Sequence, residues 1–230
     1  MKFYQNGRIP PQPHMYFIYG DGGTGKTTLF KQFPGHKLLI SFDMSTNPLA
    51  GDKDIDVGVI EQGDIPKIQS TVDNWIDRAI KSSAYQSIAL DNVTSLQNLV
   101  LENIDSKAKD NRQNYQKLQL WFREMAMKLR TSGKDIYATA REIDNGAAGL
   151  TGQGRYAPDM NMKTFNAFTS VFDVVGHIYK KDKQRMIDLD PEQGNHAKNR
   201  IDDRTLIKAN MLLQPDDLDN ATPQEKEGNE

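Results

Sequence analysis

A lysine and a threonine follow a glycine-rich turn near the amino terminus of this 230-residue chain. Residues 20–27 read Gly-Asp-Gly-Gly-Thr-Gly-Lys-Thr, a full match to the pattern G-x-x-x-x-G-K-[ST]. Glycines let the backbone approach a polyphosphate closely, so that its N–H groups can bind phosphate oxygens at the start of a helix. Lys26 can reach the β- and γ-phosphates, and the Thr27 hydroxyl can bind Mg²⁺. The pattern predicts a nucleoside triphosphate site, and the residues expected to bind the nucleotide are Gly20, Asp21, Gly22, Gly23, Thr24, Gly25, Lys26, Thr27 and Thr28.

A second acidic signal lies further along the chain. Residues 87–91, Ser-Ile-Ala-Leu-Asp, form an apolar run that ends in a carboxylate. In this class of site a carboxylate at the end of a neighbouring strand holds Mg²⁺. Thr27 and Asp91 are therefore the expected metal-binding residues.

The same glycines also satisfy the dinucleotide pattern G-x-G-x-x-G, and Asp43 follows the next apolar run at about the distance of a ribose-binding acid. However, Lys26 and Thr27 have no role in a dinucleotide site, whereas Asp91 has the form of a magnesium partner. The triphosphate interpretation is therefore favoured.

Composition and charge limit the possible domain organisation and classes of function. The length suits one α/β domain, expected over residues 1–213. Residues 214–230 carry a net charge of −5, which leaves about +3 on the rest, and this acidic tail is expected to be disordered. The absence of cysteine excludes disulfides and thiol catalysis. The sequence shows no apolar run of membrane-spanning length and no apolar signal segment, which predicts a cytoplasmic protein.

The elements that must position these residues alternate between strands and helices. Helical periodicity is carried by apolar stripes that include Trp75 in one helix and Tyr115 in another, and both side chains are expected to be buried. Such alternation predicts a mostly parallel sheet with helices on both faces. The expected strands are 15–19, 38–42, 86–91 and 135–140, and the expected helices are 28–32, 66–80, 94–105 and 112–132.

The last third of the chain has a different character. Residues 143–164 are rich in glycine and aperiodic, which predicts a long functional loop that carries Arg155, Tyr156 and Lys163. Two β-rich runs, 171–179 and 184–189, predict a hairpin. Further on, Lys198 and Arg200 are separated by one residue, so on an extended segment they point the same way.

Taken together, these features resemble the small phage RecA-like ATPases of the Sak type, which are associated with single-strand annealing and homologous recombination. The resemblance covers roughly residues 14–210. It is carried by the phosphate loop, the Asp91 strand, Asn114-Tyr115, residues 139–142, Pro158-Asp159 and the terminal Ala-Lys-Asn-Arg at 197–200.

The resemblance implies roles for several residues. A Lys-x-Arg pair reaches the γ-phosphate of a neighbouring subunit in such proteins, which assigns this role to Lys198 and Arg200. A carboxylate after the second strand polarises the attacking water, which assigns that role to Asp43, where many relatives have Glu. Arg141 stands where many relatives have His.

The expectation is thus an α/β protein with a RecA-like P-loop NTPase fold, a mostly parallel central sheet and a carboxy-terminal β-hairpin. It would hydrolyse ATP with Mg²⁺ as a homo-oligomer, in a ring or a filament, and act on single-stranded DNA in a host-cell cytoplasm. A single-strand DNA-binding protein is a candidate partner. The residues expected to contact DNA are Arg141, Arg155, Tyr156 and Lys163.

Two other functions use the same phosphate loop. A nucleoside or nucleotide kinase would use residues 143–164 as a lid and would not respond to DNA. A nucleotide-switched DNA-binding or helicase-loading module would bind ATP and DNA with negligible turnover. The sequence leaves these alternatives open, because one fold serves all three.

Overall fold

A computed structural model describes residues 2–104, 111–146, 154–191 and 194–213. The acidic tail expected at 214–230 and part of the loop expected at 143–164 lie outside the described residues. The strands of the described part are β1 (Met15–Gly20), β2 (Lys37–Ser41), β3 (Ile55–Val59), β4 (Ser87–Asp91), β5 (Asp135–Asp144), β6 (Tyr156–Pro158), β7 (Val174–Lys181), β8 (Gln184–Asp188), β9 (Lys198–Asn199) and β10 (Leu206–Lys208). The helices are α1 (Lys26–Leu29), α2 (Ile68–Lys81), α3 (Val93–Asn103), α4 (Asn111–Arg130) and α5 (Met162–Thr169).

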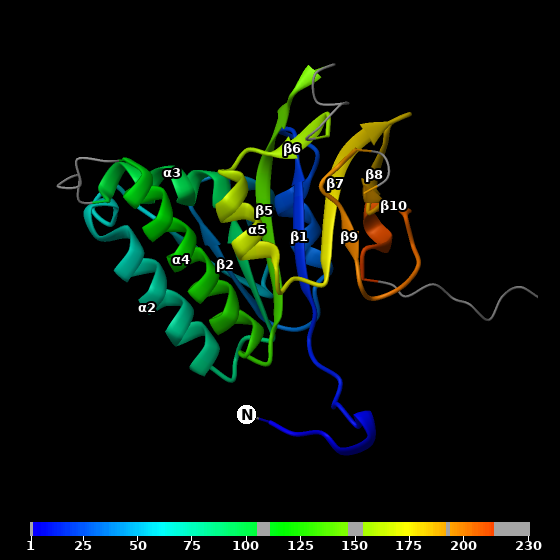
Figure 1. Cartoon of the computed structure of the whole chain (residues 1–230), viewed down its shortest axis with the longest axis horizontal. Helices are drawn as coiled ribbons and strands as arrows, with labels where there is room; N and C mark the ends of the chain where they lie inside the picture. The colour runs from blue at the N-terminus through cyan, green and yellow to red at the C-terminus, as the bar shows by residue number, and fades with distance from the viewer. Residues whose placement is uncertain (1, 105–110, 147–153, 192–193, 214–230) are drawn as a thin grey trace, which may run out of the picture.

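The fold is built on one sheet, whose strands lie in the order β10-β8-β7-β1-β5-β4-β2-β3. From β7 to β3 all neighbouring strands are parallel, so their carboxyl ends meet at one edge. Strand β5 lies between β1 and β4 and thus separates the phosphate-loop strand from the Asp91 strand (Figure 1). Strands β8 and β10 extend the sheet in antiparallel fashion. The α/β fold expected from the sequence, with its mostly parallel central sheet and carboxy-terminal hairpin, is confirmed.

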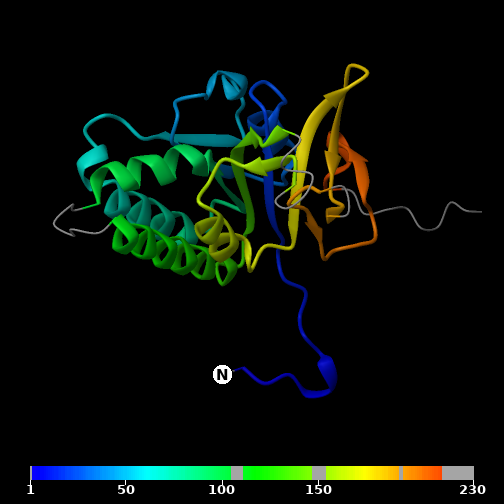
Figure 2. The same cartoon turned by 45° about the horizontal axis from the view of Figure 1, so that its top comes forward.

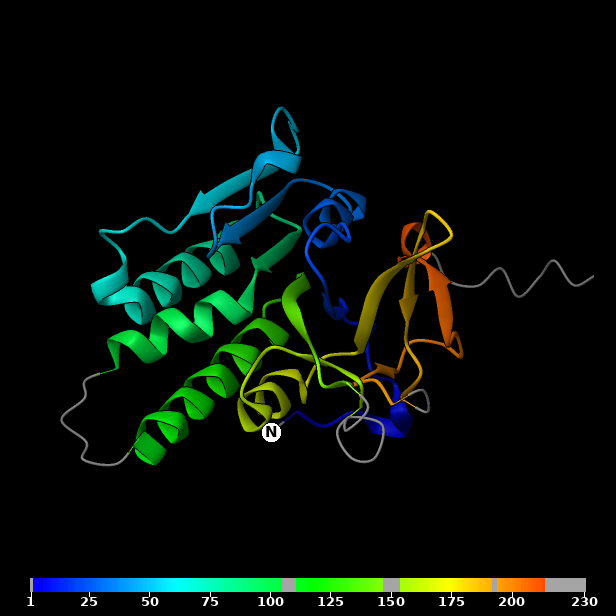
Figure 3. The same cartoon turned by 90° about the horizontal axis from the view of Figure 1, so that it is seen from above.

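Alternate residues of each central strand feed two separate hydrophobic clusters, one on each face of the sheet. Phe17 of β1 packs on the face covered by α2, α3, α4 and α5, whereas Ile18 packs on the opposite face with Leu29 and Phe30. Figure 3 shows α2, α3, α4 and α5 together on one side of the sheet. The opposite side is covered by α1 and by short 3₁₀ turns at Phe30–Gln32, Asn47–Leu49 and Ala209–Met211. Burial of both faces explains why β1 reads as a continuous apolar run.

Several expected boundaries differ from the structure. Strand β3 was not expected, because only its first residue is fully buried and its sequence has no apolar run. Trp75 and Tyr115 were expected in the core, but their exposed fractions are 39% and 43%. Trp75 instead lies against Gly58 of the edge strand β3.

The segment 143–164 is more ordered than expected. Strand β5 continues to Asp144, β6 pairs with it antiparallel, and α5 begins at Met162. The Asn161 side chain accepts hydrogen bonds from the backbone N–H groups of Lys163 and Thr164, and this local cap starts a helix too short to show a periodic pattern. The expectation of an aperiodic loop is therefore wrong for the described parts of this segment.

The amino-terminal segment before β1 runs away from the sheet (Figure 2). It includes a 3₁₀ turn at Gln5–Gly7, and its Phe3 and Ile9 side chains are 83% and 61% exposed. A further 3₁₀ turn at Ile65–Lys67 precedes α2, where Pro66 was expected to open the helix.

Candidate nucleotide site

The phosphate loop connects β1 to α1 at the carboxyl edge of the sheet. Gly23 and Gly25 have positive φ angles of 73° and 98°, a conformation that glycine adopts without strain. A β-carbon at Gly20 would overlap the carbonyl oxygen of Ile178 in β7. Gly20 therefore lets β7 pack directly beside the start of the loop. The Tyr137 hydroxyl donates a hydrogen bond of 2.8 Å to the Lys26 carbonyl oxygen, which ties the first turn of α1 to β5.

The Lys26 ammonium lies within the loop. Its Nζ donates hydrogen bonds of 2.6 and 2.7 Å to the carbonyl oxygens of Gly20 and Asp21. Burial lowers the pKa of Lys26, and the nearby carboxylates of Asp91, Glu142 and Asp21 oppose that shift. The side chain is thus held against the phosphate loop and lines its cavity, where a lysine of this motif can contact phosphate oxygens.

Thr27 and Asp91, the two expected metal ligands, are in direct contact. The Thr27 hydroxyl donates a hydrogen bond of 2.6 Å to Asp91 Oδ2, and the Thr139 hydroxyl donates to Oδ1. Burial raises the pKa of Asp91, while the hydrogen bonds from Thr139 and Thr27 act in the opposite direction. A carboxylate and a hydroxyl are hard oxygen donors and fit Mg²⁺.

Asp43 follows β2 and lies beside this pair. It accepts hydrogen bonds from the Asn92 side-chain amide and, at 3.0 Å, from the backbone N–H of Ser45. Arg141 lies with its guanidinium 3.7 Å from Asp43 Oδ2. The sequence analysis did not identify Asn92. The available signal was an N-cap residue directly after a buried strand.

One cavity of about 800 Å³ unites these groups. It is lined by the phosphate loop together with Asp43, Asp91 and Arg141. Three further charged residues that the sequence analysis did not assign to the nucleotide also line it: Glu142, Asp159 and Arg185.

Residues 12–201 match the family AAA_24, described as an AAA domain. The chain belongs to this family. It is a P-loop ATPase, and binding of ATP with Mg²⁺ is a general property of such domains.

Other comparisons add little to this assignment. No curated protein matches the sequence. Among solved structures, the chain is similar to a KaiC-like protein from the hyperthermophilic archaeon Pyrococcus horikoshii OT3. The identity is 12%, the TM-score is 0.46, and the similarity covers 77% of this chain and 78% of the other. Within the part that the structure describes, no helix has the length and apolar character needed to cross a membrane.

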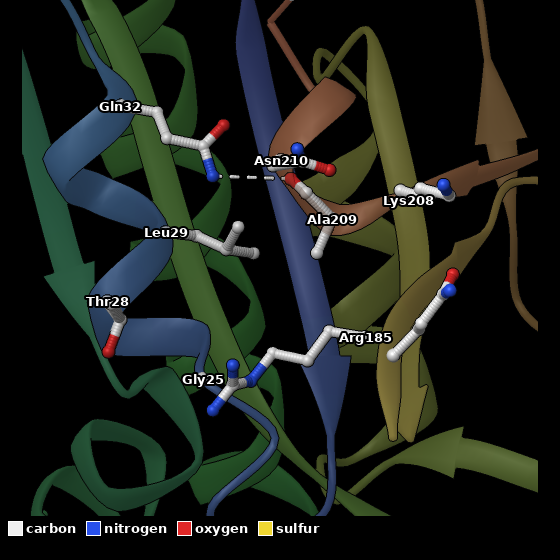
Figure 4. Close-up of a pocket in the computed structure, with 9 residues that line it drawn as sticks. Gly25, Thr28, Leu29, Gln32, Arg185, Lys208, Ala209 and Asn210 are labelled. Atoms are coloured by element: carbon white, nitrogen blue, oxygen red, sulfur yellow. Dashed lines mark hydrogen bonds between the residues drawn. The ribbon is translucent and has the colours of Figure 1, made fainter. Parts of the chain in front are cut away.

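A smaller hollow of about 290 Å³ adjoins the loop of this AAA domain on the side of α1 (Figure 4). One wall is formed by Thr28, Leu29 and Gln32, and the other by Ala209 with its neighbours Lys208 and Asn210. Gln32 Nε2 donates a hydrogen bond of 3.3 Å to the Ala209 carbonyl oxygen and closes one end.

Arg185 of β8 crosses the other end of this hollow. Its Nε would lie only 2.8 Å from a β-carbon at Gly25, so the guanidinium rests on the phosphate loop. Arg185 lines both this hollow and the main cavity, and the two are therefore adjacent. Sequence alone did not point to Arg185, because its proximity depends on the β7–β8 hairpin folding back over the loop.

Lys198 and Arg200 lie away from the phosphate loop of their own chain. Lys198 Nζ donates a 2.9 Å hydrogen bond to the Thr169 carbonyl oxygen, and Arg200 donates one of 3.4 Å to that of Ser170. Cations are favourable at this carboxyl end of α5. Burial and the charge of Arg200 lower the pKa of Lys198 to about 8. The cavity beside the pair shares no residue with the nucleotide cavity.

The four residues expected to contact DNA occupy three places. Arg141 lines the nucleotide cavity. Arg155 and Tyr156 are together, with the guanidinium carbon 5.0 Å from the ring centroid, and Arg155 also pairs with Asp144 at 3.3 Å. Lys163 lines a different groove, between α4 and the start of α5. The structure therefore brings together only two of the four.

Proposed function

We propose that this AAA-domain ATPase hydrolyses Mg²⁺-ATP in a homo-oligomer and acts on single-stranded DNA, in annealing or strand exchange of the phage recombination type. The observation that carries the hydrolytic part is the 2.6 Å contact between Thr27 and Asp91 directly beside the phosphate loop. A hydroxyl and a carboxylate held together beside this loop support the binding of a metal-bound triphosphate.

Each group would then have one task in an in-line displacement. Water forms a bond to the γ-phosphorus as the bond to the β–γ bridging oxygen breaks, which yields ADP and inorganic phosphate. The loop amides and Lys26 hold the phosphate oxygens, while Thr27 and Asp91 hold Mg²⁺, which neutralises charge on the phosphates when bound. Asp43 orients the water and takes up its proton. Catalysis of this kind is mostly charge placement.

The nucleoside part of ATP would occupy the hollow beside α1. Leu29 and Ala209 supply apolar walls, and Gln32 supplies an amide. Arg185 lies between this hollow and the phosphates, so it can contact both parts of one nucleotide.

The separation of Lys198 and Arg200 from the phosphate loop of their own chain supports the proposed homo-oligomer. Lys198 and Arg200 lie next to each other, but their cavity shares no residue with that of the phosphate loop. If the pair contacts the γ-phosphate, it must do so on a second copy of the chain. A shared site of this type would make ATP hydrolysis depend on assembly.

The DNA part is supported by the cations and rings beside the nucleotide cavity. Arg155 is half-exposed above Tyr156, and aromatic rings with nearby cations suit the binding of single strands. Glu142 lines the nucleotide cavity and lies on β5 two residues before Asp144, the ion-pair partner of Arg155.

One experiment tests the proposal. ATP turnover is measured with and without single-stranded DNA, and the size of the particle is measured under the same conditions, with Lys26→Ala protein as the inactive control. We expect hydrolysis that DNA stimulates and an oligomer whose size or stability depends on ATP. Turnover by a monomer without any response to DNA would contradict the DNA and assembly parts. ATP consumed only when a nucleoside is added would establish the kinase alternative.

A further inference from the structure

A second cavity, of about 630 Å³, opens on the other side of the phosphate loop. Asp21, Gly22 and Glu142 line both this cavity and the nucleotide cavity, so the two share a wall. Other walls come from β6, from β7, from Asp188 at the end of β8 and from Asn195. The volume lies within the range of small-ligand sites.

Aromatic rings form the inner wall of this second cavity. The ring of His177 lies nearly parallel to those of Tyr156 and Tyr179, with centroid distances of 4.9 and 5.5 Å and interplanar angles of 22° and 27°. On β1, Tyr19 stacks on the same histidine at 5.1 Å. Because the tyrosine rings cover the faces of His177, another planar group can add to this stack only at its outer ring faces.

Polar groups are fixed among the rings. His177 Nε2 lies 2.7 Å from Glu142 Oε2, and the histidine side chain is only 4% exposed. Across the cavity, Asp188 accepts a hydrogen bond of 2.7 Å from the Asn195 amide. The wall thus combines flat rings with amide and carboxylate edges, which can hydrogen-bond the edge of a base.

Cations stand at the mouth of the second cavity. Arg155 covers the Tyr156 ring, and its side chain is 51% exposed although it pairs with Asp144. Lys180 is exposed on β7 and also lines the cavity. The aromatic rings can stack on the base of one nucleotide unit, and the two cations can contact its phosphate.

We propose that the second cavity binds a nucleobase against Tyr156, His177 and Tyr179, with the attached phosphate at Arg155 and Lys180, and that Glu142 couples its occupancy to the nucleotide site. The inference deepens the proposed action on DNA and rests on it. Two sources can supply a nucleobase: a single-stranded oligonucleotide, which fills the whole site, or a free nucleoside as a phosphoryl acceptor, which has no phosphate and would occupy the ring part alone.

The coupling follows from the position of Glu142. Its carboxylate is hydrogen-bonded to His177 in the second cavity and also lines the cavity of the phosphate loop. Lys26 lines that same nucleotide cavity. A base that displaces His177 would change the position of this carboxylate and hence the field at Lys26.

Binding of the base is tested with two labelled oligonucleotides of equal length, one of thymidines and one abasic. We expect wild type to bind the thymidine strand about tenfold more tightly, and Tyr156→Ala to remove that preference while Tyr156→Phe retains it. Tyr115→Ala, which removes an exposed ring on α4, is the matched control and should behave as wild type. Competition with free thymidine separates the sources: displacement of the strand indicates a pocket that also takes a nucleoside.

The outcomes separate the pocket from the wider function. If wild type binds the thymidine strand but Tyr156→Ala keeps the same preference over the abasic strand, the pocket is wrong and action on DNA stands. If wild type hydrolyses ATP but binds neither strand nor thymidine, both are wrong. Binding of thymidine alone would support the pocket and overturn the proposed DNA substrate.

Coupling is tested by measuring strand affinity with and without a non-hydrolysable ATP analogue. Wild type should show a several-fold change, and Glu142→Gln should reduce it. His177→Asn serves as a second variant on the same path, so that a folding defect in one does not decide the result. An unreduced response in both variants, each with a wild-type circular dichroism spectrum, would overturn the role of Glu142.

Discussion

Asn92 donates its side-chain N–H to the Asp43 carboxylate while its own side-chain oxygen caps helix α3. The oxygen accepts a hydrogen bond of 2.9 Å from the backbone N–H of Ser95, and the side chain is buried. Because the oxygen is engaged at the helix start, the amide nitrogen can only face Asp43. The start of α3 thus determines the orientation of the carboxylate proposed to position water.

Replacement of Asn92 separates its two contacts. Asn92→Ser retains an N-cap hydroxyl but loses the donor to Asp43, so we expect kcat to fall about tenfold with little loss of stability. Asn92→Ala should lose about 1 kcal/mol of unfolding free energy in addition, because the cap is also removed. Steady-state ATPase assays and urea unfolding measure the two effects.

The Asp43→Asn background provides the control for this prediction. If Asn92 acts through Asp43, Asn92→Ser should have a much smaller effect on kcat once Asp43 is already replaced. Equal effects in both backgrounds would show that Asn92 acts elsewhere, and a normal kcat in Asp43→Asn itself would exclude this carboxylate from catalysis.

The phosphate loop and the metal pair should give different phenotypes. Lys26→Ala should reduce turnover by orders of magnitude at every Mg²⁺ concentration, because a charge at the phosphates is lost. Asp91→Asn should instead raise the Mg²⁺ concentration needed for half-maximal activity. Magnesium titrations of both variants check this, and an unchanged rate in Lys26→Ala would contradict the hydrolytic site.

Complementation tests the proposed role of Arg200 in trans. Lys26→Ala and Arg200→Ala proteins should each be inactive, and a mixture should regain part of the activity at interfaces that join an intact loop to an intact arginine. An arginine supplied in this way contributes about 10³ to 10⁵ in rate. If mixed oligomers form but stay inactive at all ratios, Arg200 does not act in trans, and its position at the end of α5 is structural.

Lys198 should give stability a distinctive pH dependence. Burial and Arg200 lower its pKa from 10.5 to about 8 in the folded state. Between those values the unfolded chain binds the extra proton, so the contribution of Lys198 to the free energy of unfolding rises with pH across this window. Urea unfolding of wild type and Lys198→Met at pH 7.5 and 9.5 should show wild type gaining relative to the variant. A constant difference would contradict the lowered pKa.

Salt dependence separates the two cations that the sequence placed on one loop. Arg155→Ala should lower the log–log slope of oligonucleotide affinity against salt by about 0.7, the value for one lost phosphate contact on a single strand. Lys163→Ala should leave the slope unchanged, because that side chain lines another groove. The reverse pattern would move the DNA path to α4 and α5.

The phosphate loop was predictable because all its functional groups lie within eight consecutive residues. Asp91 was predictable as well, since an apolar strand and its terminal acid are contiguous. Arg185 and His177 were not, because their approach to the loop depends on how β7 and β8 pair with β1. Neither residue belongs to a local pattern.

Elements were predicted best where burial was continuous. Strand β1 is buried along its full length and was found almost to the residue, whereas the edge strand β3 is largely exposed, lacks a continuous apolar run and was missed. Trp75 followed the helical stripe, yet it lies partly exposed against β3. Helical periodicity predicts which face of the helix a side chain lies on. Whether that side chain is buried depends on how far the sheet extends beneath the helix.

Near its carboxyl end, β5 carries two consecutive charged residues that contact different partners. Successive side chains of a strand face opposite sides of the sheet, so Arg141 lies near Asp43 whereas Glu142 reaches His177. Which of the two residues contacts Asp43 and which contacts His177 therefore depends on the face of the sheet toward which each side chain points. Insertion of one residue ahead of Arg141 would turn the base toward His177 and the acid toward Asp43, whereas insertion of two would restore each charge to its own side.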